Sequence, residues 1–260
     1  MLSKLSPTLE VKNLVITYHP DGGNVLLRKD TLAVQDISFS VNHDESLAIV
    51  GESGSGKTSI LMAILGFVQP NSGTIYFMGK DIWQLSPTEM NELRHWIQPV
   101  FQDSGASLNP RMTIGSILRE ALRVFNVSDS RQEFIAELFA QVGLEVNILS
   151  RYPYQLSGGQ KQRVNLARAL IGKPKLIILD ESFAAQDISN QANLVNLLLT
   201  LRRNYALNYL IVSHNLSVIT PLADRILVIR SGQFVEEGPV VEIIFHTTNE
   251  YTKTLINAVS

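Results

Sequence analysis

The segment Gly51–Thr58 carries the clearest chemistry in the chain, and we call it the phosphate loop. Its sequence, Gly-Glu-Ser-Gly-Ser-Gly-Lys-Thr, fits the pattern G-x-x-x-x-G-K-[ST] and lies between an apolar run and a helical pattern. Glycines let backbone N–H groups surround phosphate oxygens, and a following helix adds the positive end of its dipole. We expect Lys57 to reach the β- and γ-phosphates of a nucleotide and Thr58 to offer its hydroxyl to Mg²⁺. A glycine turn beside an exposed lysine is the weaker alternative. The predicted nucleotide-binding residues are Gly51, Ser53, Gly54, Ser55, Gly56, Lys57, Thr58 and Ser59.

Two consecutive carboxylates, Asp180 and Glu181, end the apolar run that starts at Leu176. Asp180 is suited to holding Mg²⁺ through water. Glu181 points to the other side of the strand end, which suits a general base for an attacking water. An apolar run that ends in Asp-Glu is common by itself. Downstream of a phosphate loop, the functional interpretation is favoured.

Two further polar residues follow predicted strands. Gln102 comes after the strand-like segment 97–101, and its amide could touch both Mg²⁺ and the attacking water. Taken alone, Gln102 is more typical of an ordinary loop residue. His214 ends the apolar segment 210–213, where a histidine often serves as a structural hydrogen-bond partner. At the carboxyl edge of a parallel sheet it could instead contact the γ-phosphate.

A second glycine segment, Leu156–Gln160, precedes a helical pattern. Ser157 is a good N-cap, so a capped helix after a turn is one interpretation. The other is a second anion site, made by a hydroxyl and the N–H groups of a helix start. Chemistry alone does not choose between them. The residues of this predicted site are Ser157, Gly158, Gly159 and Gln160.

The elements that position these residues follow from hydrophobic periodicity. Ser86 and Ser128 are predicted N-caps, and Gly143 is a predicted C-cap. Strands are expected over 9–18, 32–41, 46–50, 74–78 (as an edge strand), 97–101, 176–179, 209–212, 226–229 and 233–236. Helices are expected over 58–68, 88–96, 113–125, 128–142, 159–171, 190–205, 240–245 and 249–259.

Composition sets outer limits on function. The 260 residues are 45% hydrophobic with a net charge of −2 and no cysteine. A polybasic surface for nucleic acid is therefore not expected, and disulfides and thiolate metal sites are excluded. We find no apolar run of the roughly 18–20 residues that a membrane span needs. Strands that alternate with helices predict an α/β core whose ligand lies at the strand carboxyl ends.

The motifs together resemble those of an ABC-transporter ATPase subunit. In order, they match the Walker A, Q-loop, signature, Walker B, D-loop and H-loop elements at Gly51–Thr58, Gln102, Leu156–Gln160, Leu176–Glu181, Asp187 and His214. Within that superfamily the chain is most similar to the oligopeptide, dipeptide and nickel import ATPases. The segments that carry this similarity are 100–103, 106–113, 152–160 and 250–255.

Some positions depart from the family pattern. Ser182-Phe183 stands where the family usually has Pro-Thr, and Asp44 replaces a common glycine. The D-loop is Ala184-Ala185-Gln186-Asp187 instead of Ser-Ala-Leu-Asp. Asp187 is retained, but its altered neighbours suggest that two ATP sites could be unequal.

The resemblance implies a P-loop NTPase of the ABC ATPase fold. An antiparallel β subdomain and an inserted helical subdomain would accompany the RecA-like core. One domain would span 1–260, with the core at about 1–85 and 156–240, the helical subdomain at about 86–155 and a helical tail at about 240–260.

The resemblance further implies ATP and Mg²⁺ as ligands and two subunits that sandwich two ATP molecules. Each nucleotide would lie between Walker A of one subunit and the signature of the other, with Asp187 at the shared boundary. Lys57, Gln102, Glu181 and His214 would form the catalytic set, and Thr58, Gln102 and Asp180 the metal set. Tyr18 would stack on adenine, although a core-covering strand aromatic is the alternative.

The implied partners are a second, homologous or identical ATPase subunit, transmembrane permease subunits and, indirectly, an extracytoplasmic solute-binding protein. The chain would lie peripherally at the cytoplasmic face of a membrane, with a permease helix docked near Gln102 and Asn109–Met112. Two alternatives stay open. One is an ABC ATPase that acts on a soluble partner, and the other is a regulatory cassette that binds ATP without hydrolysing it.

Overall fold

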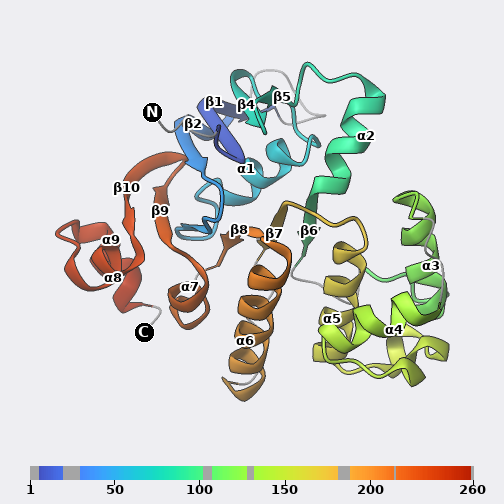
Figure 1. Cartoon of the computed structure of the whole chain (residues 1–260). Helices are drawn as coiled ribbons and strands as arrows, with labels where there is room; N and C mark the ends of the chain where they lie inside the picture. The colour runs from blue at the N-terminus through green and yellow to red at the C-terminus, as the bar shows by residue number, and fades with distance from the viewer. Residues whose placement is uncertain are drawn as a thin grey trace, which may run out of the picture. The chain divides into compact units, whose positions relative to one another are not determined.

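The computed structural model describes residues 6–19, 30–101, 107–127, 132–180, 188–213 and 215–258 (Figure 1). The chain divides into two compact units. The first comprises residues up to Asn91 together with those from Asn208 onward, and the second runs from Glu92 to Leu207. The helical insert predicted over 86–155 falls mostly in the second unit, which extends further along the chain, so the boundaries of the insert stay a prediction.

An antiparallel sheet in the first unit has the strand order β2-β1-β4-β5. The expectation that 74–78 forms an edge strand is wrong, because β4 lies between β1 and β5. Met78 and Gly79 both have positive φ, and this tight turn lets Lys80 pair back onto Phe77. The strands are β1 (Leu9–Tyr18), β2 (Thr31–Val41), β4 (Ser72–Phe77) and β5 (Lys80–Asp81).

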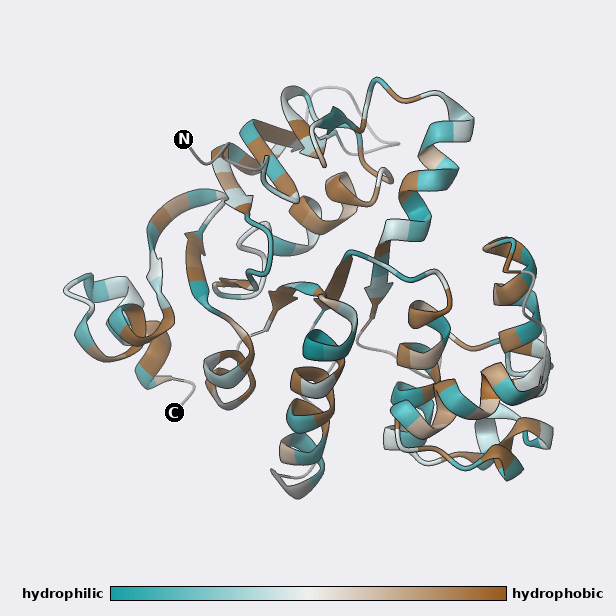
Figure 2. Ribbon diagram, viewed as in Figure 1, coloured by the Kyte–Doolittle hydropathy of each residue, from teal (hydrophilic) through white to brown (hydrophobic). Residues whose placement is uncertain are grey.

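A mostly parallel group of strands forms the core of the first unit. β3 (Leu47–Val50) pairs in parallel with both β8 (Asn208–Val212) and β9 (Arg225–Arg230). All four residues of β3 are buried, and β8 and β9 are mostly hydrophobic (Figure 2). β10 (Gln233–Pro239) adds to β9 in antiparallel. The phosphate loop and Ser213 therefore follow their strands at the same carboxyl edge of this sheet.

Helices of the first unit lie near their predicted positions, with two differences. α1 ends four residues before the expected Val68, because the N–H groups of Phe67 and Val68 turn back to the carbonyl of Met62. α7, which contains Pro221, was not predicted from the sequence. The bounds are α1 (Lys57–Ile64), α7 (Leu216–Leu222), α8 (Val240–His246) and α9 (Glu250–Asn257).

The second unit contains two parallel strands and several helices. Val100 pairs with Leu179, so both strands end at the same edge. The predicted C-cap at Gly143 is confirmed by its positive φ and by the bond from Leu144 N–H to Phe139 O. Ser128 lies outside the described residues. The strands are β6 (Ile97–Val100) and β7 (Leu176–Asp180). The helices are α3 (Ile114–Val124), α4 (Gln132–Gln141), α5 (Gly158–Leu170), α6 (Ile188–Tyr205) and the three-ten turns η2 (Val146–Ser150) and η3 (Pro153–Gln155).

One further helix, α2 (Pro87–Trp96), contains the point at which the two units divide. Its predicted cap is confirmed, since Glu89 N–H donates to Ser86 Oγ while the Glu89 carboxylate accepts from the Ser86 N–H. These reciprocal bonds satisfy two amides at the start of the helix. The hydrogen bonds from Ser86 also lower the pKa of the Glu89 carboxyl group.

The turn between β9 and β10 supports the phosphate loop, and two glycines allow a test of that support. Gly232 donates its N–H to Ser55 O at 2.9 Å, and a Cβ at Gly232 would lie 2.7 Å from Ala33 O. Gly79 has a similar positive φ, but no atom of the described residues lies within 4 Å of a Cβ added there. Gly79→Ala should lower the free energy of unfolding by about 1–2 kcal/mol through backbone strain alone. Gly232→Ala should lower it by about 1–3 kcal/mol more, because a backbone oxygen must move. Denaturant unfolding checks both values, and equal losses would contradict the tight approach at Gly232.

Candidate nucleotide site

The phosphate loop is held from two sides within the first unit. Ser55 O accepts the N–H of Gly232, and Ser55 N–H donates to Glu52 O at 3.2 Å. Gly56 has a φ of 104°, and a Cβ there would lie 2.3 Å from Ala33 O on β2. Only glycine combines this backbone conformation with so close an approach. The loop is therefore fixed against the edge of β2 and the β9–β10 turn.

Lys57 is folded into the loop that it is predicted to serve. Its side chain is 6% exposed, and its Nζ donates to Gly51 O at 2.8 Å, Glu52 O at 2.7 Å and Ser55 Oγ at 3.3 Å. All three acceptors are neutral. A phosphate oxygen is a stronger partner for an ammonium group than a carbonyl is. Lys57 is therefore placed where it can exchange these bonds for contacts with phosphate.

The start of α1 fits an anion. Gly56, at the N-cap, makes no side-chain cap, and no acidic residue lies in the first turn. The backbone N–H groups and the dipole at this end thus favour negative charge. A hollow of about 370 Å³ opens here, lined by Gly54, Gly56 and residues 57–59 together with residues of β2 and Ser231. The loop, the lysine and the hydroxyl of Thr58 together suit a nucleoside triphosphate bound with Mg²⁺.

Tyr18 lies beside this hollow at the end of β1. Its hydroxyl donates to Ser59 Oγ at 3.2 Å, and the residue is 41% exposed. A core-covering aromatic would be buried, whereas this ring is accessible. The predicted stacking on adenine remains a prediction, and the link to α1 gives the ring a defined position next to the phosphate loop.

The second glycine segment belongs to the second unit and starts α5. Ser157 Oγ accepts from Gln160 N–H at 3.2 Å, while Gln160 Oε1 accepts from Ser157 N–H at 3.0 Å. The capped-helix interpretation of Ser157 is thus confirmed. The anion-site interpretation is compatible with the same geometry, since a hydroxyl that accepts one bond still has a proton to donate. No acidic residue lies in the first turn of α5.

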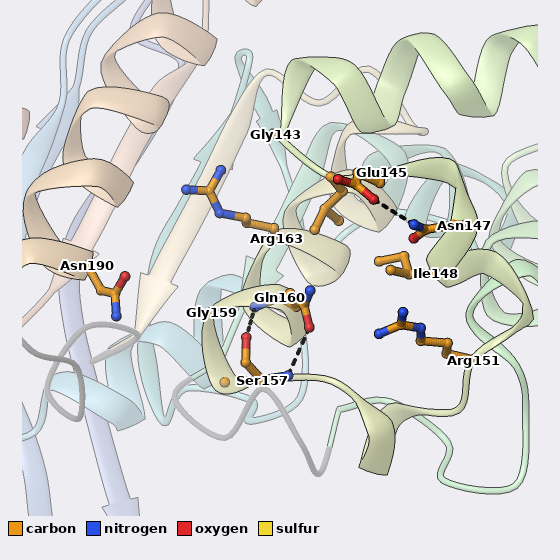
Figure 3. A pocket seen from close by; sticks show the side chains of 12 residues that line it. Gly143, Glu145, Asn147, Ile148, Arg151, Ser157, Gly159, Gln160, Arg163 and Asn190 are labelled. Carbon is orange, nitrogen blue, oxygen red and sulfur yellow. Dashed lines mark hydrogen bonds between the residues drawn. The ribbon is translucent and has the colours of Figure 1, made fainter.

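A pocket of about 580 Å³ adjoins this capped start, as Figure 3 shows. Arg151, Arg163 and Asn190 line it together with the second glycine segment. Arg163 Nη1 donates to Val142 O at 2.6 Å, which fixes the guanidinium at the end of α4. Among the described residues of the lining, the only carboxylate is that of Glu145, which accepts a bond from Asn147 at 2.6 Å. The described lining thus has two arginines and one carboxylate that already accepts a hydrogen bond, which favours binding of an anion.

The sequence patterns do not identify the two arginines and Asn190 as residues of this pocket. Arg163 lies three residues after Gln160. An arginine on a helix is usually a solvated charge, so neither its type nor its spacing indicates an anion site. Arg151 belongs to the turn before η3 and is brought to the pocket by the fold. Only the positions of the surrounding elements identify these residues.

Asp180 ends β7 in the same unit. Leu176–Leu179 are fully buried and Asp180 is half-buried, so the strand delivers one carboxylate to its edge. Because β6 and β7 are in parallel register, Phe101 follows at that same edge. The predicted site residues that come next along the chain, Gln102 and Glu181, lie outside the described residues. So do Asp187 and His214.

Comparisons with known proteins agree with this geometry. Residues 34–184 match the family model described as ABC transporter. The oligopeptide transport ATP-binding protein OppF of Salmonella typhimurium is 43% identical over 234 residues, which cover 89% of this chain and 70% of that protein. The oligopeptide transport ATP-binding protein OppD of Mycobacterium tuberculosis is 42% identical over 262 residues, which cover 99% of this chain and 43% of that protein.

Solved structures show the same fold. CbiO1 from Clostridium perfringens, described as part of the ABC transporter complex cbiONQ, superposes with a TM-score of 0.78 and 26% identity over 92% of this chain and 91% of that one. The ATP-binding cassette MJ0796, in a dimeric post-hydrolysis state bound to ADP and Pi, gives a TM-score of 0.77 and 27% identity over 89% of this chain and 98% of that one. The predicted ABC ATPase fold is therefore confirmed.

Proposed function

We propose, from the premise that the chain belongs to the ABC transporter family, that it is the ATP-hydrolysing subunit of a peptide importer. The single observation that carries the proposal is the loop of Gly51–Thr58, in which a buried lysine and an uncapped helix start face a hollow. The 43% identity with an oligopeptide transport protein supports peptides as the cargo.

Binding of the substrate ATP would use the first unit. Lys57 would turn its ammonium group from the loop carbonyls to the β- and γ-phosphates, and the amides at the start of α1 would hold the phosphate oxygens. Tyr18 would stack on the adenine base. Bound Mg²⁺ would neutralise phosphate charge, and the hydroxyl of Thr58 and the carboxylate of Asp180 are the described groups suited to hold it.

Hydrolysis would require residues from the strand ends. Glu181 would take a proton from the attacking water, with Gln102 and His214 contacting the water and the γ-phosphate. The second glycine segment of one subunit would complete the ATP site of another. There the Ser157 hydroxyl would donate a hydrogen bond to a phosphate oxygen. ATP would thereby close a dimer, and hydrolysis would open it. The dimeric state of the related cassette MJ0796 supports the pairing of two subunits.

The membrane partner would dock near Asn109–Met112. Ser107, two residues before this segment, is bonded to α5, because Arg168 Nη1 donates to Ser107 O at 2.7 Å and Asn165 Nδ2 donates to Ser107 Oγ at 2.9 Å. A displacement of the segment would therefore be transmitted to α5, the helix that Ser157 caps. Burial lowers the pKa of the Arg168 guanidinium, but the group stays charged at physiological pH.

Purification of the tagged chain from detergent-solubilised membranes tests this function. We expect permease proteins and a second ATPase subunit to co-purify, and peptide transport to raise the rate of ATP hydrolysis. Among the described residues no helix is long and apolar enough to cross a bilayer. Recovery with ribosomes or a DNA-repair assembly instead would contradict the proposal.

Ser157→Arg tests the role of the second glycine segment. The bulky cation should block the phosphate of a partner's ATP, so ATP binding by the monomer should persist while ATP-driven dimerisation is lost. Loss of the cap alone should cost about 1 kcal/mol of stability. Thr113→Ala is the matched control, because Thr113 caps α3 by accepting from Ser116 N–H. Gel filtration with ATP separates the two variants, and normal dimerisation of Ser157→Arg would exclude a two-chain site.

A further inference from the structure

The helix α9 packs beside the start of the phosphate loop. Thr252, Leu255 and Ile256 of this helix share one small apolar cavity with Val50 and Gly51. Asn249 caps the helix, since its Oδ1 accepts from Tyr251 N–H at 3.0 Å and from Thr252 N–H at 3.2 Å. The first turn of α9 is thus fixed, and with it the direction in which Tyr251 leaves the backbone.

Tyr251 contacts the same peptide group that holds Lys57. The N–H of Glu52 donates to the Tyr251 hydroxyl at 3.4 Å, and the carbonyl of Gly51 accepts from Lys57 Nζ at 2.8 Å. These two groups are the two ends of a single planar peptide unit. Its orientation is therefore set by Tyr251 at one end and by Lys57 at the other. Hydrogen bonds linked through one peptide also polarise each other.

The tyrosine ring is held in turn by the strand that supports the loop. The Arg230 guanidinium lies 4.7 Å from the ring centroid, which is a cation–π distance. Arg230 is the last residue of β9, directly before the turn in which Gly232 donates to Ser55 O. The loop is thus fixed at its first peptide by Tyr251 and at its fifth residue by Gly232.

We propose that Tyr251 is a positioning residue of the nucleotide site, which makes α9 a functional part of that site. The inference rests on the proposed binding of ATP. The tyrosine hydroxyl fixes the rotation of the Gly51–Glu52 peptide, and this peptide sets the resting place of the Lys57 ammonium. Without the hydroxyl, the loop samples other orientations and must be reordered when phosphate binds. The free energy needed to reorder the loop weakens nucleotide binding, while the packing of the hydrophobic core is unchanged.

Tyr251→Phe is the direct test, because it removes one oxygen and keeps the ring on Arg230. We expect the Kd for a fluorescent ATP analogue, measured on the full chain with Mg²⁺, to rise about three-fold, the low end of what one neutral hydrogen bond contributes. Amide hydrogen exchange in the phosphate loop should become faster without nucleotide, while β3 keeps its protection. Tm should not change.

Tyr76→Phe is the matched control. Tyr76 also lies under a cation, Lys12, at 5.1 Å, but it belongs to β4, away from the contacts that the described residues make with the loop. Its variant should bind the analogue as the unchanged chain does. A Tyr251→Phe variant with unchanged Kd and unchanged loop exchange would overturn the inference. Failure of the unchanged chain to bind the analogue would instead overturn the proposed function.

Discussion

Replacement of Lys57 by methionine is expected to reduce kcat/KM for ATP by about 10²–10³ or more, as loss of one positioned charge donor typically does. Lys57 is 6% exposed, and its ammonium group donates to both Gly51 O and Glu52 O. Methionine fills a similar volume, so the variant loses the charge and leaves the loop packed. The developing charge on the phosphate then lacks its partner.

Steady-state hydrolysis and nucleotide binding measure this effect. Lys80→Met is the matched control, because Lys80 is a surface lysine whose Nζ lies 3.9 Å from the Glu89 carboxylate. An exposed ion pair of this kind contributes little to stability, so its loss should leave the rate of ATP hydrolysis unchanged. A Lys57→Met variant that hydrolyses ATP within ten-fold of the unchanged chain would contradict the assigned role.

Replacement of Glu181 by glutamine is expected to lower the rate of ATP hydrolysis by about 10²–10⁴, the usual contribution of a general base. The amide keeps the shape of the side chain but does not accept the proton of the attacking water. ATP binding should persist, because the phosphate loop and Lys57 are untouched. A closed dimer with bound ATP should therefore accumulate.

Single-turnover hydrolysis and gel filtration with ATP separate these outcomes. Asp180→Asn is the matched control at the preceding position. It should raise the Mg²⁺ concentration needed for hydrolysis, whereas Glu181→Gln should leave that requirement unchanged. A Glu181→Gln variant that turns over at a near-normal rate would exclude Glu181 as the base.

The parts of the site that depend on neighbouring residues were predictable from the sequence. The phosphate loop, the cap at Ser157 and the carboxylate at the end of β7 all follow from local patterns of glycine, hydroxyl and apolar residues. Most strands and helices were predicted for the same reason, since their hydrophobic periodicity matches their buried faces.

The parts that depend on distant residues were not predictable. Tyr251 contacts Glu52 although the two lie 199 positions apart. Arg225, a half-buried cation and the first residue of β9, bonds Glu45, which lies 180 positions away. No local pattern encodes these partners. The strand β5 was missed because its turn, Met78-Gly79, lacks the usual Asn-Gly signal. The helix α7 was missed because Pro221 disfavours a helical prediction.

The reciprocal bonds between Ser157 and Gln160 have a consequence for how quickly two subunits could assemble. The amide of each residue already has its acceptor in the single chain, so this segment does not need to fold when a partner's nucleotide arrives. Ordering a loop on contact costs free energy and slows association. A recognition surface that is rigid beforehand avoids that cost. The rate of dimer formation should then be limited by ATP binding and not by ordering of this segment, because the start of α5 is already in its final conformation.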